Sequence, residues 1–261
     1  MEQYELIKIN KEDLVNNPAP RIPVCLCLDT SGSMNTIDGG DGVVNGQIVE
    51  IDGKKYRAST TGVSRIDRLN EGIKHLFETI RNDDSARFSV EICMVKFDSK
   101  AECILPFANI ERQVEIPELV ASNDAQGNSF MGEGVNLALD LLEARKQEYK
   151  DSGVDYMQPW LILMTDGEAN GSQIVQQQAI ERIERMVGNK KIVVFPIAIG
   201  SDAGIDTLKQ FSPERQPLKL QDMKYNEFFQ FISNMMIAKS NSGDGEKVRI
   251  LLSDIKGWAE I

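Results

Sequence analysis

Short, almost wholly apolar runs alternate along this chain with longer segments whose apolar residues recur at helical spacing. The apolar runs predict strands over 22–29, 88–97, 101–107, 160–165, 191–199 and 218–220. The helically spaced residues predict helices over 65–81, 131–150, 172–187 and 225–238. Strands that alternate with helices indicate an α/β fold with a doubly wound, mostly parallel, six-stranded sheet and helices on both faces. The run 101–107 follows 88–97 so closely that we expect it as the one antiparallel edge strand.

The segment 35–64 departs from this alternation, because it is rich in Gly, Asp and Thr and has no helical periodicity. Within it two extended runs flank Asp52-Gly53, and Asp-Gly in that setting predicts a β-hairpin. We interpret 35–64 as a hairpin inserted into a single domain, close to the end of the first strand. The remaining divisions are an N-terminal extension over 1–20, the domain over 21–238 and a C-terminal tail over 239–261.

Two of the predicted strands end in acidic and hydroxyl-bearing residues. Asp29, Ser31 and Ser33 follow the first strand, and Asp166 stands in a Thr-Asp-Gly run after strand 160–165. Ligand sites in open α/β sheets lie outside the carboxyl ends of the strands, so these side chains are expected to share one site. Oxygen ligands of this kind suit a hard divalent cation such as Mg²⁺. The plainer alternative is that both aspartates only form turns, with the two serines capping the loop.

With Ser129 from the loop before helix 131–150, these residues resemble the metal-ion-dependent adhesion site of von Willebrand factor type A domains. That pattern is Asp-x-Ser-x-Ser, then a distant Thr, then an Asp in a Thr-Asp-Gly run. The resemblance implies that Asp29, Ser31, Ser33, Ser129 and Asp166 hold Mg²⁺ or Mn²⁺, and that a partner protein's Asp or Glu completes the coordination sphere. Ser129 stands where the family usually has Thr, so its rotamer is less constrained and we expect weaker metal or ligand binding.

The runs 144–150, 159–167 and 228–233 further resemble the bacterial TerY-type subgroup of this family. The whole resemblance covers roughly residues 20–240. It implies a cytoplasmic scaffold or adaptor in a stress-response, tellurite-resistance or phage-defence system. A protein kinase or a protein phosphatase of the same system is then a natural partner.

Charge and hydropathy narrow the classes of partner and compartment. The net charge of −11, from 29 basic and 40 acidic residues, argues against nucleic acid or an anionic membrane as the main partner. No apolar run approaches the ~20 residues that a membrane-spanning helix needs. The acidic N-terminus lacks the basic start of a secretory signal, so we expect a cytoplasmic protein.

The remaining chemistry-bearing residues give weaker signals. The four cysteines lie in strand-like runs and are interpreted as buried hydrophobes in a reducing compartment, rather than as zinc ligands or disulfides. Asp38 and Asp41 offer an accessory cation site, against the plainer interpretation of a solvated turn.

An alternative function is a metal-assisted hydrolase or phosphatase that uses Asp29 or Ser31. The chain has no G-x-S-x-G run and no P-loop, and its one histidine, His75, falls mid-helix. These absences favour a non-enzymatic interaction module.

Overall fold

The computed structural model describes residues 17–37, 44–51, 54–59, 62–123, 128–167, 169–200, 204–220, 224–241 and 259–260. Its main sheet contains β1 (Ile22–Asp29), β4 (Val90–Phe97), β5 (Ala101–Asn109), β6 (Trp160–Thr165), β7 (Val193–Ala198), β8 (Leu218–Leu220) and β9 (Ala259–Glu260). The strands lie in the order β5-β4-β1-β6-β7-β8-β9. The six predicted strands and the antiparallel edge formed by β5 are confirmed. The short β9 was not predicted, and it adds a second antiparallel edge beside β8.

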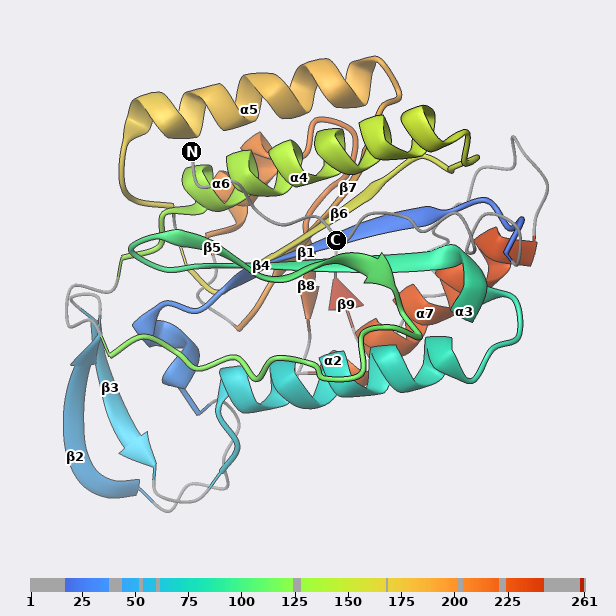
Figure 1. Cartoon of the computed structure of the whole chain (residues 1–261). Coiled ribbons are helices and arrows are strands. Elements are labelled where there is room, and N and C mark those ends of the chain that lie inside the picture. The colour runs from blue at the N-terminus through green and yellow to red at the C-terminus, as the bar shows by residue number, and fades with distance from the viewer. Residues whose placement is uncertain are drawn as a thin grey trace.

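Helices cover both faces of the sheet, as the alternation predicted (Figure 1). One face carries α2 (Arg65–Arg81), α3 (Ala86–Ser89) and α7 (Tyr225–Asn241), and the other carries α4 (Met131–Ser152), α5 (Gln173–Gly188) and α6 (Ile205–Gln210). Side chains of β1 alternate between the two resulting cores. Leu26 and Leu28 enter the core under α2 and α7, whereas Cys25 and Cys27 enter the core under α4 and α5. All four cysteines are free thiols.

The α2 and α7 helices approach closely because Gly72 lies at their contact. A Cβ atom at this position would stand only 2.3 Å from Cδ2 of Phe229. The glycine therefore makes room for an aromatic side chain that is itself fully buried.

One predicted strand begins later than expected. The run from residue 88 was predicted as strand, but Phe88 and Ser89 belong to α3 and β4 begins at Val90. The reason is local, because the carboxylate of Asp83 accepts hydrogen bonds from the backbone N–H groups of Ser85 and Ala86 at 3.0 and 2.8 Å. A carboxylate in this position starts a helical turn and overrides the apolar pattern.

The insertion forms the expected hairpin. After the short 3₁₀ helix η1 (Gly32–Asn35), β2 (Val44–Ile51) and β3 (Lys54–Ser59) pair antiparallel in a sheet of their own, which projects from the body (Figure 1). The backbone N–H of Arg65 donates to the carbonyl of Thr36 at 3.0 Å. The chain therefore leaves the domain and returns to it at nearly the same point. Ser64 and Asp67 then form a capping box that begins α2.

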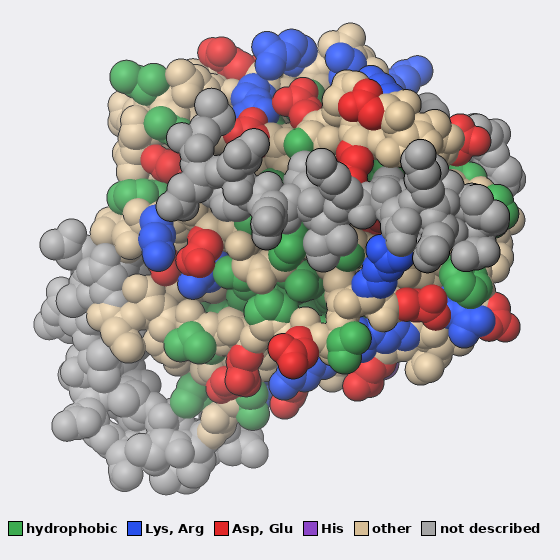
Figure 2. Space-filling model, viewed as in Figure 1, with side chains coloured by type: hydrophobic (Ala, Val, Ile, Leu, Met, Phe, Trp, Pro, Cys, Tyr) green, Lys and Arg blue, Asp and Glu red, His purple; other side chains and the backbone are tan. Residues whose placement is uncertain are grey.

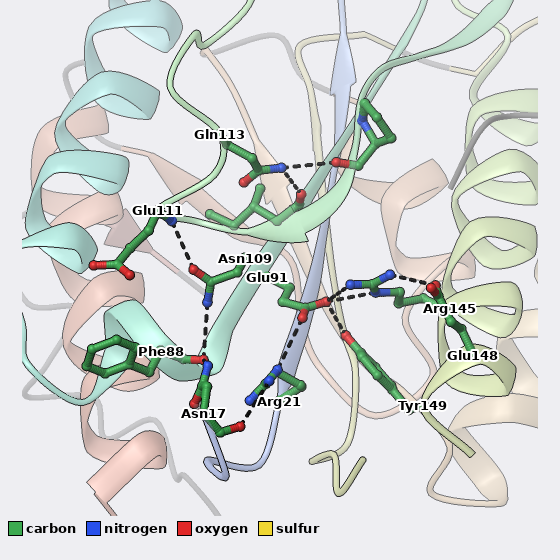
Figure 3. Close-up of polar contacts among 12 residues, drawn as sticks. Asn17, Arg21, Phe88, Glu91, Asn109, Glu111, Gln113, Arg145, Glu148 and Tyr149 are labelled. Carbon is green, nitrogen blue, oxygen red and sulfur yellow. Dashed lines mark hydrogen bonds and ion pairs between the residues drawn. The ribbon is translucent and has the colours of Figure 1, made fainter. Parts of the chain in front are cut away.

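A buried ionic cluster fixes the end of the sheet opposite the carboxyl ends of β1 and β6 (Figure 3). The carboxylate of Glu91 pairs with Arg21 at 3.3 Å and with Arg145 at 2.6 Å, and it accepts a hydrogen bond from Tyr149 at 2.6 Å. Arg21, Glu91 and Arg145 are each only 2% exposed. Because both carboxylate oxygens have partners, the desolvation of the charge is compensated and α4 is tied to β1 and β4.

The viewed surface mixes charges of both signs. Acidic and basic side chains lie together along the helices, and hydrophobic side chains gather between them (Figure 2). Within the described ranges, no helix has the length and apolarity required to cross a membrane.

Replacing Glu91 by Gln should lower the free energy of unfolding by about 3 kcal/mol, because the buried guanidinium of Arg21 loses its counter-charge and that of Arg145 is left with Glu148. The control is Glu102→Gln, which removes a carboxylate that is 46% exposed and paired with Lys96 and Lys100. That change should alter stability by no more than about 0.5 kcal/mol. Urea denaturation of both variants measures the difference, and equal effects would contradict the assignment of Glu91 as a stabilising centre.

Candidate metal centre

The ends of β1 and β6 bring the two aspartates to one edge of the sheet. Asp29 is the last residue of β1, and Asp166 directly follows the last residue of β6. These strands pair in parallel, with Leu28 opposite Met164. The loop after Asp29 is held on both sides, because the N–H of Thr30 donates to a carbonyl of β4 at 2.8 Å and the Thr30 carbonyl accepts from Ser122 at 2.7 Å. The two aspartates are therefore positioned by strand ends, and the loop after Asp29 is fixed on both sides.

The five residues predicted from sequence lie in one continuous chain of hydrogen bonds. Ser129 Oγ donates to Asp29 Oδ2 at 2.9 Å, and the backbone N–H of Ser31 donates to Asp29 Oδ1 at 2.8 Å. The hydroxyls of Ser31 and Ser33 are 3.0 Å apart. Ser33 Oγ in turn donates to Asp166 Oδ1 at 2.6 Å. All five residues are buried, so their side-chain oxygens converge away from the protein surface.

Ser129 is held by a residue that the sequence analysis did not single out. Its backbone N–H donates to Asn170 Oδ1 at 2.5 Å, and its carbonyl accepts from the Asn170 backbone N–H at 3.0 Å. This pair joins the loop before α4 to the loop after β6. It restricts the backbone at Ser129.

Two further residues at the site were also missed. The hydroxyl of Thr165 donates to Asp29 Oδ2 at 2.5 Å, and Arg65 Nη1 donates to Asp166 Oδ2 at 2.7 Å. The Thr-Asp-Gly run contains Thr165, so a signal for it was present. No local pattern identifies Arg65, because it is far from both aspartates in the sequence and stands at a helix start.

The two carboxyl groups are in an environment that opposes their charge. Burial raises the pKa of Asp29 above its usual range, although hydrogen bonds from Thr165 and Ser31 act in the opposite direction. Burial, and then the charge of Asp29, raise the pKa of Asp166 to about 7, while Arg65 lowers it. Two buried carboxylates that raise each other's cost of ionisation favour a nearby cation.

The donor set fits a hard divalent ion. It consists of two carboxylates and three hydroxyls, which are oxygen ligands suited to Mg²⁺ or Mn²⁺ rather than to a soft metal. No group of three or more His, Cys, Asp or Glu side chains is placed to hold a metal in the described part of the chain. A site here therefore depends on the serine hydroxyls to supplement the two carboxylates.

The surroundings of the site include an uncharged pocket. A cavity of about 600 Å³ opens beside Asn170, and most of its wall is made of side-chain amides: Asn170, Gln173, Gln176, Gln177 and Gln210. The pocket lies at the start of α5, and its wall includes Asn170, which is hydrogen-bonded to Ser129.

The other candidate residues lie elsewhere. His75, on α2, is half-buried, and its Nε2 is 2.8 Å from Gln230 Oε1 on α7, so it takes part in helix packing. Asp38 and Asp41, the alternative accessory site, lie outside the described residues.

Solved structures share this fold at low sequence identity. A von Willebrand factor type A protein from Catenulispora acidiphila aligns over 84% of this chain and 43% of its own, with 15% identity and a TM-score of 0.53. The D319A mutant of the PilB minor pilin from Streptococcus sanguinis aligns over 84% and 62%, with 13% identity and a TM-score of 0.53. Proximal thread matrix protein 1 from the mussel byssus aligns over 85% and 47%, with 14% identity and a TM-score of 0.50. This chain thus spans between 43% and 62% of the length of these three structures.

The sequence itself supports the same relationship. No curated protein matches this chain. The sequence model of the von Willebrand factor type A domain matches residues 57–248, which is most of the chain and includes Ser129 and Asp166. The match begins inside the hairpin insertion, so Asp29, Ser31 and Ser33 precede it. The chain belongs to the von Willebrand factor type A domain family.

Proposed function

We propose that this chain is a non-enzymatic, metal-dependent protein-interaction module. The observation that carries the proposal is the continuous chain of hydrogen bonds through Ser129, Asp29, Ser31, Ser33 and Asp166. Oxygens that already face one another need little rearrangement to hold a cation. Turn-forming residues alone would not require three hydroxyls from two separate loops to converge on two buried carboxylates.

The five residues would hold Mg²⁺ or Mn²⁺, which when bound supplies a Lewis-acidic position for an oxygen ligand from outside the chain. Neighbouring side chains orient the two carboxylates for metal binding. Thr165 and Ser129 orient the carboxylate of Asp29, and Arg65 orients that of Asp166. Because three of the five residues are neutral hydroxyls, the two carboxylates do no more than balance a divalent cation, and its coordination sphere can still accept an oxygen from a partner's carboxylate.

Replacing Asp29 by Asn should weaken Mg²⁺ binding by about tenfold or more, because the charged group at the centre of the hydrogen-bond chain is lost. Isothermal titration calorimetry with MgCl₂ measures this. The matched control is Asp140→Asn on α4, the same chemical change at a side chain that is 60% exposed, and it should leave Mg²⁺ binding unchanged. Equal affinities in the wild type and in Asp29→Asn would contradict the proposed site.

The partner is proposed to present an Asp or Glu surrounded by Lys or Arg. The reason is the net charge of −11, which repels an acidic partner at long range. Basic residues around the contact carboxylate would offset this repulsion. The amide-lined pocket beside Asn170 adds an uncharged surface next to the proposed contact.

Partner capture should require both the metal and Asp29. We expect a protein to be retained from the native cytoplasm by the wild type with Mg²⁺, and to be lost with EDTA or in Asp29→Ala. The association rate of the captured partner should fall as ionic strength rises, because the attraction is screened. Equal retention by the wild type and by Asp29→Ala, each with Mg²⁺ and with EDTA, would place the partner contact outside the metal centre. Metal-dependent turnover of a phosphate ester or another hydrolysable substrate that disappears in Asp29→Ala would favour a hydrolase or phosphatase instead.

The cellular setting is proposed from the resemblance to the TerY-type subgroup. The runs 144–150, 159–167 and 228–233 support a cytoplasmic scaffold or adaptor in a stress-response, tellurite-resistance or phage-defence system. A protein kinase or phosphatase of that system is the proposed partner. The domain is proposed to extend over 21–238, with the hairpin as an insertion that contributes to the partner surface.

Deleting residues 40–60 and closing the gap with a short Gly linker should leave the fold and Mg²⁺ binding intact, because Thr36 and Arg65 already meet at 3.0 Å. Partner binding should change, since the hairpin is anchored beside the site. Circular dichroism, calorimetry and the capture experiment test the three statements. Unchanged partner binding would show that the hairpin is not part of the interface.

A further inference from the structure

Among the residues that the structure describes, Arg65 brings a positive charge into contact with a proposed metal ligand. Its guanidinium Nη1 is 2.7 Å from Asp166 Oδ2, and the two side chains are 1% and 0% exposed. The other oxygen of the same carboxylate accepts from Ser33. Asp166 therefore already has a cationic partner in a place where water cannot screen the attraction.

The position of Arg65 is set by the backbone around it. It is the first residue of α2 and lies between Ser64 and Asp67, the two residues of the capping box, and its backbone N–H donates to the carbonyl of Thr36. The guanidinium also packs against Gly200, in the loop after β7. A Cβ atom at Gly200 would stand 2.6 Å from Nη2, and φ there is +79°. A glycine in this place leaves room for the guanidinium, so the ion pair is built into the fold.

The charges of these three side chains have a consequence for metal binding. Asp29 and Asp166, when ionised, carry two negative charges, and Arg65 returns one positive charge. A divalent cation would leave the group with one positive charge, and a partner's carboxylate would then make it neutral. Without Arg65 the metal alone would neutralise the group, and an incoming carboxylate would add an uncompensated negative charge to a buried site.

Resting on the function proposed above, we propose that Arg65 is a tethered counter-cation of the candidate metal centre that shares Asp166 with the metal. In the absence of metal it holds the carboxylate of Asp166 in place and offsets one of the two negative charges. In the presence of metal it weakens cation binding and leaves the loaded site positive toward an acidic side chain. Arg65 is thus a positioning residue, which acts through Asp166.

The test compares Arg65→Gln with the wild type, using MgCl₂ alone as the probe. In EDTA the variant should melt about 10 °C lower, because Asp166 loses its partner. Mg²⁺ should raise its Tm by more than it raises that of the wild type. The Mg²⁺ dissociation constant of the variant should be about tenfold lower, since the repulsion between two cations is removed. Arg65→Lys keeps the charge and should bind Mg²⁺ much as the wild type does.

The matched control is Arg145→Gln, which removes another buried guanidinium from a carboxylate at the far end of the sheet. It should lower the Tm equally in EDTA and in Mg²⁺, because it lies outside the metal centre. A purely structural role for Arg65 would give the same result for Arg65→Gln. Equal Mg²⁺ dissociation constants for the wild type and Arg65→Gln would overturn the proposal and leave the proposed function standing.

The other outcomes are also decisive. If Arg65→Gln stays unfolded in saturating Mg²⁺ while Arg145→Gln folds, the metal cannot replace the guanidinium and the proposal is overturned. If Arg65→Lys binds Mg²⁺ as tightly as Arg65→Gln, the charge is not the cause and the proposal is equally overturned. Mg²⁺ binding to Arg65→Gln but not to the wild type would support the proposal that Arg65 supplies the cationic partner of Asp166. It would contradict the proposed metal dependence of the native chain. Binding to neither would overturn both proposals.

Discussion

The architecture depends on the parallel pairing of β1 with both of its neighbours. Because β1 lies between β4 and β6, its last residue is covered on every side, and Asp29 is placed beside the end of β6 with no exposure to water. The loops that follow must then supply partners for buried oxygens. Ser31, Ser33 and Ser129 do so, and the loop after Asp29 is fixed by backbone bonds to β4 and to Ser122. The geometry of the site is a consequence of the sheet register rather than of the loops alone.

Buried charges are compensated at one end of the sheet and only partly compensated at the other. At one end the charge of Glu91 is compensated by two guanidinium groups and a tyrosine hydroxyl, and Arg145 pairs with Glu148 as well, so this cluster stabilises the fold. At the other end two carboxylates share one described guanidinium contact, and burial raises the pKa of both. Buried carboxylates whose charge is only partly compensated destabilise the fold, and the same charge favours the binding of a cation. This contrast separates the functional edge of the domain from its structural edge.

The sequence predicted the central strands and the edge of the sheet that carries the candidate site. The features that it did not predict have physical explanations. The wholly apolar runs predicted the central strands, and two aspartates at strand ends predicted a shared edge, because burial and parallel pairing leave few alternatives. Local side-chain capping by Asp83 shifted the start of β4, and a two-residue strand such as β9 has too little pattern to be recognised. Arg65 and Asn170 were missed since their roles come from contacts across more than 40 positions of sequence, 101 and 41 respectively. Metal binding by the five residues stays a prediction.

The backbone hydrogen bond between Thr36 and Arg65 closes the base of the hairpin, so the hairpin can be exchanged as a unit. Since the loop is already closed at its base, its length contributes only weakly to the entropy of folding, and other sequences could be exchanged for it without loss of the domain. A lineage could therefore vary the hairpin quickly while the strand-end oxygens stay fixed. Recognition could diversify in this way around an unchanged centre, much as variable loops do on a constant scaffold.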